Sequence, residues 1–260
     1  MEINEKVVLV TGASEGIGAA CVNAFQKRGA KLSLVARSKD KLERVAAGDA
    51  LAVIGDVTRE EDRKRAVERT LEVYGRIDIL INNAGVGLYA PSWRAPMEEV
   101  RRMFELNLFA ALSLTQLVVP QMRARRSGCI VNVGSIAGKV TLPWLTLYSA
   151  SKYALGSFTD GLRMELARDG VHAITVCPGY VSTRFQEHIL LGKVPAGVQR
   201  SKAFRISADQ CASAILRGVE RNARTVVTPR LGWLFVIAER LFPSLVDSQL
   251  QDIYFRGLDS

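Results

Sequence analysis

The sequence contains few of the residues that most often build metal centres and nucleophilic triads. Its 260 residues include only two histidines, His172 and His188, which argues against a histidine metal site or a Ser-His-Asp triad. Its four cysteines lie far apart and form no C-x-x-C pair, a pattern that favours buried free thiols in a reducing compartment. We therefore expect no bound metal ion.

The sequence also lacks low-complexity tracts, repeats of solenoid period and a signal-peptide pattern, and we expect no apolar stretch as long as a membrane span of roughly 18 residues. Its formal net charge is +9, but the arginines are scattered and accompany no nucleic-acid motif. A solvated basic surface is therefore favoured over a nucleic-acid partner. The length and composition favour a single domain over residues 1–260 and a cytoplasmic location.

Short apolar runs alternate with longer segments of helical period. The runs cover residues 7–10, 32–36, 51–54, 77–81, 129–133, 173–177 and 225–228, and the helical segments cover residues 17–28, 60–74, 97–125, 149–168 and 207–222. Runs that are nearly continuous in Val, Ile and Leu are typical of parallel strands buried on both faces. The alternation predicts an α/β fold, namely a Rossmann-type doubly wound parallel sheet of about seven strands.

Unusual residues follow several of these runs at the ends where such sheets bind ligands. The first run is followed by T-G-A-S-E-G-I-G, which contains Gly12, Gly16 and Gly18 and opens a helical segment. Glycines permit close approach of a pyrophosphate to the helix N-terminus. The G-x-x-x-G-x-G spacing differs from the strict dinucleotide fingerprint, and an ordinary strand-to-helix turn explains it nearly as well.

Tyr148 and Lys152 are four residues apart in Y-S-A-S-K, at the start of the helical segment 149–168. Residues at i and i+4 share one face of a helix, so the ammonium is expected beside the phenol. A neighbouring cation favours the phenolate and so lowers the pKa of a tyrosine, which is otherwise about 10. The lower pKa would make Tyr148 an effective acid or base. The alternative is an ordinary surface Tyr near a surface Lys.

Several motifs in one order resemble the short-chain dehydrogenases/reductases over roughly residues 5–185. They are T-G-A-S-E-G-I-G, Asp56-Val57, N-N-A-G from Asn82 to Gly85, Asn107, Ser135, Y-S-A-S-K and P-G at Pro178 and Gly179. The resemblance implies an oxidoreductase that interconverts a carbonyl and a secondary alcohol. A non-catalytic nucleotide-binding regulator and a sugar-nucleotide epimerase or dehydratase are the alternatives. The complete catalytic set argues against the first, and the little room for a C-terminal substrate domain argues against the second.

The resemblance also implies a role for each catalytic residue. Tyr148 would exchange the proton, and Lys152 would lower its pKa and bind the nicotinamide ribose. Ser135 would hydrogen-bond the substrate oxygen, and Asn107 would hold a water that links Lys152 to solvent. Because Asn107 lies inside the predicted helix 97–125, its alternative reading is a helix-surface side chain.

The cofactor contacts that the resemblance implies are spread over the chain. They are Gly12, Ser14, Glu15, Gly16, Ile17, Gly18, Arg37, Ser38, Asp56, Val57, Asn83, Ala84, Gly85, Tyr148, Lys152, Pro178, Gly179, Val181 and Thr183. Asp56 and Val57 would contact adenine, and Thr183 would contact the nicotinamide carboxamide. Asn83 would support the turn after the fourth strand.

The end of the second strand indicates which cofactor is used. An NAD enzyme usually has an acid there, whereas this chain has Ala36 followed by Arg37 and Ser38. Arginine can bind a 2′-phosphate that an acid would repel, so NADP is favoured over NAD. One departure is that Ser14 and Glu15 stand in the turn where many NADP-using relatives have a second basic residue.

The C-terminal part carries fewer signals. Residues 186–206 would be the substrate loop, and Ile189, Leu190, Leu191, Val194 and Phe204 favour a hydrophobic small-molecule substrate, although core packing explains them equally well. Residues 230–245 form an apolar segment, similar to the tails of steroid- and lipid-active members of the family. We expect it to pack on its own subunit or on a partner in a homodimer or homotetramer, with peripheral membrane contact as the alternative.

Overall fold

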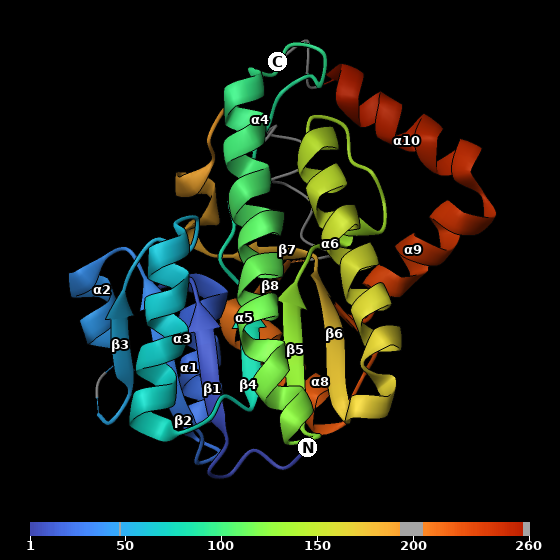
Figure 1. Ribbon diagram of the computed structural model, residues 1–260. Helices are drawn as coiled ribbons and strands as arrows, with labels where there is room; N and C mark the ends of the chain where they lie inside the picture. The colour runs from blue at the N-terminus through green and yellow to red at the C-terminus, as the bar shows by residue number, and fades with distance from the viewer. Residues whose placement is uncertain (47, 193–204, 257–260) are drawn as a thin grey trace.

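The computed structural model describes residues 1–46, 48–192 and 205–256. Seven parallel strands form one sheet in the order β3-β2-β1-β4-β5-β6-β9, which confirms the predicted doubly wound Rossmann-type fold (Figure 1). The strands are β1 (Val7–Thr11), β2 (Lys31–Ala36), β3 (Leu51–Ile54), β4 (Ile79–Asn82), β5 (Gly128–Val133), β6 (Val171–Pro178) and β9 (Thr225–Thr228). Each lies within two residues of its predicted bounds. A separate pair, β7 (Tyr180–Ser182) and β8 (Arg205–Ser207), was not predicted.

Helices cover both faces of the sheet. They are α1 (Gly16–Gln26), α2 (Lys39–Val45), α3 (Glu60–Tyr74), α4 (Met97–Phe104), α5 (Ala110–Ala124), α6 (Thr146–Glu165), α8 (Ala208–Glu220), α9 (Gly232–Leu241) and α10 (Pro243–Arg256). Helices α1, α2 and α8 pack on one face of the sheet, and α3, α5 and α6 pack on the other. Successive strand residues therefore enter opposite cores: Val10 faces α1, whereas Leu9 faces α3 and α5. Short helical turns η2 (Ile136–Gly138), η3 (Ala167–Asp169) and η4 (Arg184–His188) lie in connections.

The predicted helix over residues 97–125 is interrupted by a π-helical turn, η1 (Glu105–Phe109), between α4 and α5. Asn107 lies in this turn and is 1% exposed, so the reading of it as a helix-surface side chain is wrong. Its Oδ1 accepts the Val86 N–H at 2.9 Å, and its Nδ2 donates to the Val86 carbonyl at 3.0 Å. The extra residue of a π turn shifts the helix register locally, and such turns are frequent at functional sites.

The same segment, Met97–Ala124, has the length and apolar composition of a membrane-spanning helix. The expectation that no stretch reaches that length is therefore wrong by this criterion. A core helix of a globular protein passes the same test, and α5 buries Leu114, Val118 and Met122 against the sheet. Its apolar character is accounted for by this packing.

The predicted apolar segment 230–245 folds into α9 and the start of α10. Val236 and Val246 are buried against Val140, so one side of the segment packs on its own subunit, as predicted. The other side presents Leu234 and Leu241, which are 63% and 65% exposed. Of the predicted substrate loop 186–206, residues 193–204, including Val194 and Phe204, lie outside the described residues.

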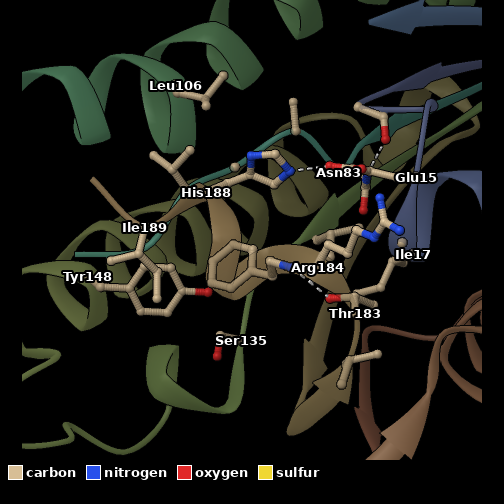
Figure 2. A pocket seen from close by; sticks show the side chains of 18 of the residues that line it. Glu15, Ile17, Asn83, Leu106, Ser135, Tyr148, Thr183, Arg184, His188 and Ile189 are labelled. Carbon is tan, nitrogen blue, oxygen red and sulfur yellow. Dashed lines mark hydrogen bonds and ion pairs between the residues drawn. The ribbon is translucent and has the colours of Figure 1, made fainter. Parts of the chain in front are cut away.

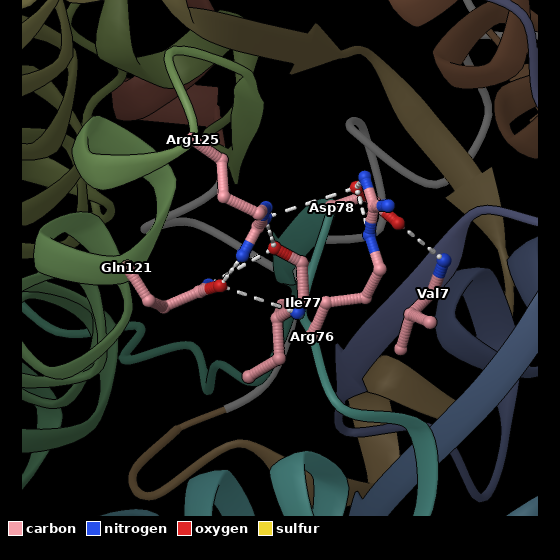
Figure 3. A network of polar contacts seen from close by, with 6 residues as sticks. All are labelled: Val7, Arg76, Ile77, Asp78, Gln121 and Arg125. Atoms are coloured by element: carbon pink, nitrogen blue, oxygen red, sulfur yellow. Dashed lines mark hydrogen bonds and ion pairs between the residues drawn. The ribbon is translucent and has the colours of Figure 1, made fainter.

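A polar network ties the elements together at the amino ends of β1 and β4 (Figure 3). Asp78 is 1% exposed, and its Oδ2 accepts the Val7 N–H at 2.9 Å. Its Oδ1 accepts Arg76 Nε at 2.9 Å and lies 3.8 Å from Arg125 Nη2. Arg125 also donates to the Ile77 carbonyl at 2.9 Å, so one carboxylate links β1, the approach to β4 and the end of α5. This network lies at the amino ends of the strands, opposite the carboxyl ends described next.

Candidate active site

The glycine-rich turn after β1 packs directly on the residues that follow β4. Asn83 Nδ2 donates to the carbonyls of Thr11 and Gly12 at 2.9 and 3.2 Å. At Gly18, a Cβ atom would lie 2.1 Å from the Gly12 carbonyl oxygen, so only glycine allows the first turn of α1 to approach this closely. Asn83 thus ties the residues after β4 to the glycine-rich turn, and its predicted contact with the cofactor stays a prediction. Gly18 acts through packing.

A cleft of about 1120 Å³ runs along the carboxyl ends of the strands. All the predicted cofactor-binding residues except Gly18 line it, and so do Ser135, Tyr148 and Lys152. Asn107 lies behind its wall. The rule that ligands bind beyond the carboxyl ends of parallel strands thus brings together residues from position 12 to position 183. The volume is sufficient for a dinucleotide and a small second molecule.

Ser135 and Tyr148 present their hydroxyl groups to the same part of this cleft (Figure 2). Ser135 caps η2, where its Oγ accepts the Ala137 N–H at 3.1 Å. That contact leaves the Ser135 hydroxyl proton available for donation, and the Ser135 hydroxyl is close enough to Tyr148 to lower the pKa of its phenol. Tyr148 and Lys152 share one face of α6, as predicted from their spacing, and both are buried. The reading of these two residues as an ordinary surface pair is therefore wrong.

The predicted effect of Lys152 on Tyr148 differs from what the structure shows. Burial raises the pKa of Tyr148 to about 12, which outweighs the lowering effect of the Ser135 hydroxyl. Burial also lowers the pKa of Lys152 to about 8. The Lys152 ammonium lies 5.8 Å from the centroid of the Tyr148 ring and donates to the Val133 carbonyl at 3.0 Å. Tyr148 is thus a protonated phenol at neutral pH, the form required of a proton donor.

Asn107 and Lys152 face a small space beside Gly85. A Cβ atom at Gly85 would lie 3.0 Å from Asn107 Oδ1 and 3.4 Å from Lys152 Nζ, so the glycine keeps this space open. The Asn107 Nδ2 also donates to Ser151 Oγ at 3.2 Å, which fixes the amide against α6. The predicted water relay through Asn107 stays a prediction.

Arg37, Ser38 and Asp56 line the end of the cleft near β2 and β3. Asp56 Oδ1 accepts the N–H and the hydroxyl of Thr58 at 3.0 and 2.8 Å, and Arg37 Nη1 lies 4.0 Å from Asp56 Oδ2. The guanidinium therefore stands at the mouth of this end with most of its donors unused.

Sequence reasoning missed a polar contact that crosses the cleft. Glu15, in the glycine-rich turn, is contacted by Lys41 of α2 at 2.8 Å and by His188 of η4 (Figure 2). Burial raises the pKa of Glu15, but these two hydrogen bonds offset that effect and leave its pKa lowered. Nothing in the local sequence links residues 15, 41 and 188, because only the tertiary fold brings them together.

The opposite end of the cleft is largely apolar. It is lined by Val86, Tyr89, Leu142, Leu145, Phe185, Ile189 and Leu190 around Tyr148. Ile189 and Leu190 come from the predicted substrate loop, and the ring of Phe185 lies 6.1 Å from that of Tyr148, centroid to centroid. The cleft therefore combines charged and polar groups at one end with an apolar chamber and a proton donor at the other.

Comparisons with known proteins agree with this geometry. The short chain dehydrogenase family model matches residues 6–192. The chain belongs to the short-chain dehydrogenase/reductase family. It is 34% identical over 263 residues to the 11-beta-hydroxysteroid dehydrogenase-like 2 of Arabidopsis thaliana, a match that covers 97% of this chain and 82% of that protein.

Two solved structures show the same fold. A short chain dehydrogenase from Burkholderia cenocepacia in complex with NADP superposes with a TM-score of 0.82 at 30% identity, covering 96% of this chain and 99% of that one. A family member from Burkholderia phymatum in complex with NAD superposes with a TM-score of 0.86 at 24% identity, covering 94% and 96%. Membership of this dehydrogenase/reductase family makes the protein an NAD(P)-dependent oxidoreductase, and the neighbours include both cofactors.

Proposed function

We propose that this protein interconverts a carbonyl and a secondary alcohol on a hydrophobic small molecule, with NADP(H) as its cofactor. The observation that carries the proposal is the placement of the Ser135 hydroxyl and the buried Tyr148 phenol at an apolar chamber, at one end of a cleft whose other end holds Arg37. The glycine-rich turn, Asp56 and Thr183 would hold the dinucleotide between them. When bound, the cofactor supplies or accepts a hydride.

The residues of the chain account for the accompanying proton transfer. Tyr148, protonated at neutral pH, would donate its phenolic proton to the oxygen of a carbonyl substrate. Ser135 would donate a hydrogen bond to the same oxygen as negative charge develops on it. Lys152 provides a positive charge behind the ring and would stabilise the phenolate that remains after proton donation.

The end of β2 supports NADP over NAD. Ala36 stands where an acid would bind a ribose 2′-hydroxyl, and the exposed Arg37 guanidinium lies next to it in the cleft. A carboxylate at this place would repel a 2′-phosphate, whereas a guanidinium can form charge-assisted hydrogen bonds with it.

Replacing Arg37 with aspartate should weaken NADPH binding by roughly 10- to 100-fold and leave NADH binding unchanged or improved. The variant removes a charged hydrogen bond and adds repulsion toward the 2′-phosphate. Titration of both cofactors by protein fluorescence measures this, and Arg37→Met separates loss of attraction from repulsion. A wild-type preference for NADH, or an unchanged preference in the variant, would show that the proposed cofactor is wrong.

The substrate is best identified by screening ketones, aldehydes and secondary alcohols of increasing apolar size with NADPH or NADP⁺. The apolar lining around Tyr148 predicts that kcat/KM rises with added methylene groups, each contributing about 0.8 kcal/mol if fully buried. Turnover confined to small polar alcohols would contradict the hydrophobic substrate class, and absence of any turnover would favour the non-catalytic alternative.

We also propose that the exposed side of α9 meets a second copy of this chain. It presents Trp233, Leu234, Ile237 and Leu241, and α10 adds Leu245 beside them. Five such side chains would each gain roughly 1.5–3 kcal/mol from full burial. Helix α9 has ten residues and is about 15 Å long, too short to cross a bilayer, and the same face on two subunits can pair about a two-fold axis.

Replacing Leu234 and Leu241 together with glutamate should convert the assembly to monomers whose melting temperature no longer depends on protein concentration. The fold of one subunit should be retained, because both side chains already face solvent in it. Light scattering and thermal melts measure the two effects. Phe235→Glu is the contrasting variant, since Phe235 packs beside Val236 and its replacement should lower stability. An unchanged oligomer would contradict the subunit contact. Liposome binding by the wild type that the double variant loses would also contradict it and would favour contact with a membrane surface.

A further inference from the structure

Lys41 lies at the same end of the cleft as the residues proposed to select NADP. It stands on α2, three residues after Ser38, which precedes the first residue of that helix. Arg37, Ser38 and Lys41 all line the cleft. The Lys41 ammonium contacts Glu15, the N-cap residue of α1 in the glycine-rich turn.

The Lys41 ammonium is held more firmly than the Arg37 guanidinium. Its Nζ lies 2.8 Å from Glu15 Oε2, and its side chain is 35% exposed. The side chain of Arg37 is 69% exposed, and its nearest acid, Asp56, lies 4.0 Å away. An ammonium has three hydrogen-bond donors, and the contact with Glu15 occupies one of them. Lys41 can therefore keep its ion pair and still donate into the cleft.

Arg37 alone does not neutralise the charge of a 2′-phosphate. A phosphate monoester carries about −1.5 to −2 charges at pH 7, whereas Arg37 supplies one positive charge that it also directs toward Asp56. The other basic residues that line the cleft stand on different elements: Lys152 lies on α6 behind Tyr148, Arg101 and Arg102 lie on α4, and Arg184 lies on η4. Among the described residues, Lys41 is the cation that shares the end of β2 with Arg37 and Ser38.

We propose that Lys41 is a second cationic ligand of the cofactor's 2′-phosphate and determines the preference for NADP together with Arg37. This inference rests on the proposed use of NADP. The ammonium would bind the 2′-phosphate from the α2 side, and Arg37 would bind it from the end of β2.

The test uses two adenosine nucleotides that differ by the 2′-phosphate alone. Isothermal titration of the wild-type protein and of Lys41→Met with 2′,5′-ADP and with 5′-AMP isolates that group from the pyrophosphate and the nicotinamide. We expect the variant to bind 2′,5′-ADP about 10-fold more weakly or worse, and 5′-AMP within about twofold of wild type. Lys41→Arg, which keeps the charge, should retain most of the discrimination.

Lys39→Met is the matched control. Lys39 begins the same helix, and its replacement by methionine removes the same charge. Its Nζ is 3.9 Å from Glu43 Oε1, its side chain is 65% exposed, and it does not line the cleft. Both nucleotides should bind this variant within about twofold of wild type, because screening weakens a distant exposed charge. A loss as large as in Lys41→Met would show that general charge is responsible and would overturn the assignment.

The outcomes separate this inference from the proposed cofactor. A wild-type protein that binds 5′-AMP as tightly as 2′,5′-ADP would overturn the NADP preference and with it the role of Lys41. Wild-type discrimination that Lys41→Met retains would overturn the role of Lys41 alone. An equal loss of both nucleotides in Lys41→Met would also overturn it, since Lys41 would then act on the shared 5′-phosphate or on the shape of the site.

Discussion

Replacing Tyr148 with phenylalanine should lower turnover by about 10²-fold or more while cofactor binding is largely retained. The substitution removes the phenolic oxygen, which carries the transferable proton, and keeps the ring. That ring packs 6.1 Å from the ring of Phe185 and covers the Lys152 ammonium, so the walls of the cleft should be preserved. Steady-state rates on a substrate from the screen measure the loss, and NADPH titration measures the retained binding.

Tyr89→Phe is the matched control for this substitution. Tyr89 also lines the cleft, and burial raises the pKa of its phenol as well, with the neighbouring Tyr148 adding to the effect. The Ser135 hydroxyl lowers the pKa of Tyr148 but is not among the causes that shift the pKa of Tyr89. We expect turnover of this variant within about tenfold of wild type. A Tyr148→Phe enzyme that works at the wild-type rate, or a larger loss in Tyr89→Phe, would show that the proton donor has been assigned wrongly.

The residues that sequence reasoning placed correctly follow rules that operate over short distances. The seven strands were predicted because each is a continuous apolar run, and Gly12, Ser135 and Pro178 line one cleft because each follows such a run. The spacing of Tyr148 and Lys152 placed both on one face of α6, since a helix repeats about every 3.6 residues. None of these inferences needs knowledge of how distant segments pack.

The features that were missed or misread depend on tertiary packing. The burial of Asn107 arises because the backbone of Val86, on a different element, takes both hydrogen bonds of its amide. The raised pKa of Tyr148 reflects desolvation, which exceeds any effect that could be inferred from the nearby Lys152. The contact of Lys41 with Glu15 joins two helices whose sequences contain no signal for it.

The burial of α9 also depends on tertiary packing, although here the sequence predicted more burial than one subunit provides. The run around Trp233 is apolar nearly all round, which led to the expectation that it must be buried. In one subunit only the side that bears Val236 is buried, because Val140 and Val246 offer a surface to that side alone. The sequence could indicate that the segment needs a surface to pack on, but which of its sides stays exposed is a property of the packing.

Replacing Asp78 with alanine should lower the free energy of unfolding by about 2 kcal/mol or more. The variant would leave the buried Val7 N–H without its acceptor and would deprive Arg76 and Arg125 of the carboxylate that both approach. Asp78 itself is 1% exposed, whereas the two arginine side chains are 40% and 28% exposed. The Val7 N–H would stay buried without a partner and so retain the cost of its desolvation, while the arginines can turn to solvent. Chemical denaturation followed by circular dichroism measures the change.

Asp169→Ala provides the comparison, because Asp169 also accepts an arginine, Arg123 Nε at 2.6 Å, but that arginine is 57% exposed. An ion pair of this kind contributes about 0–1 kcal/mol, so the control should be only slightly destabilised. Because Asp78 lies at the amino ends of β1 and β4, and the cleft lies at the carboxyl ends of the strands, the folded Asp78→Ala protein should bind NADPH with wild-type affinity. Equal stability of the two variants would mean that the Asp78 network does not hold β1, β4 and α5 together. A selective loss of NADPH affinity in Asp78→Ala would mean that the network also affects the cleft at the other end of the strands.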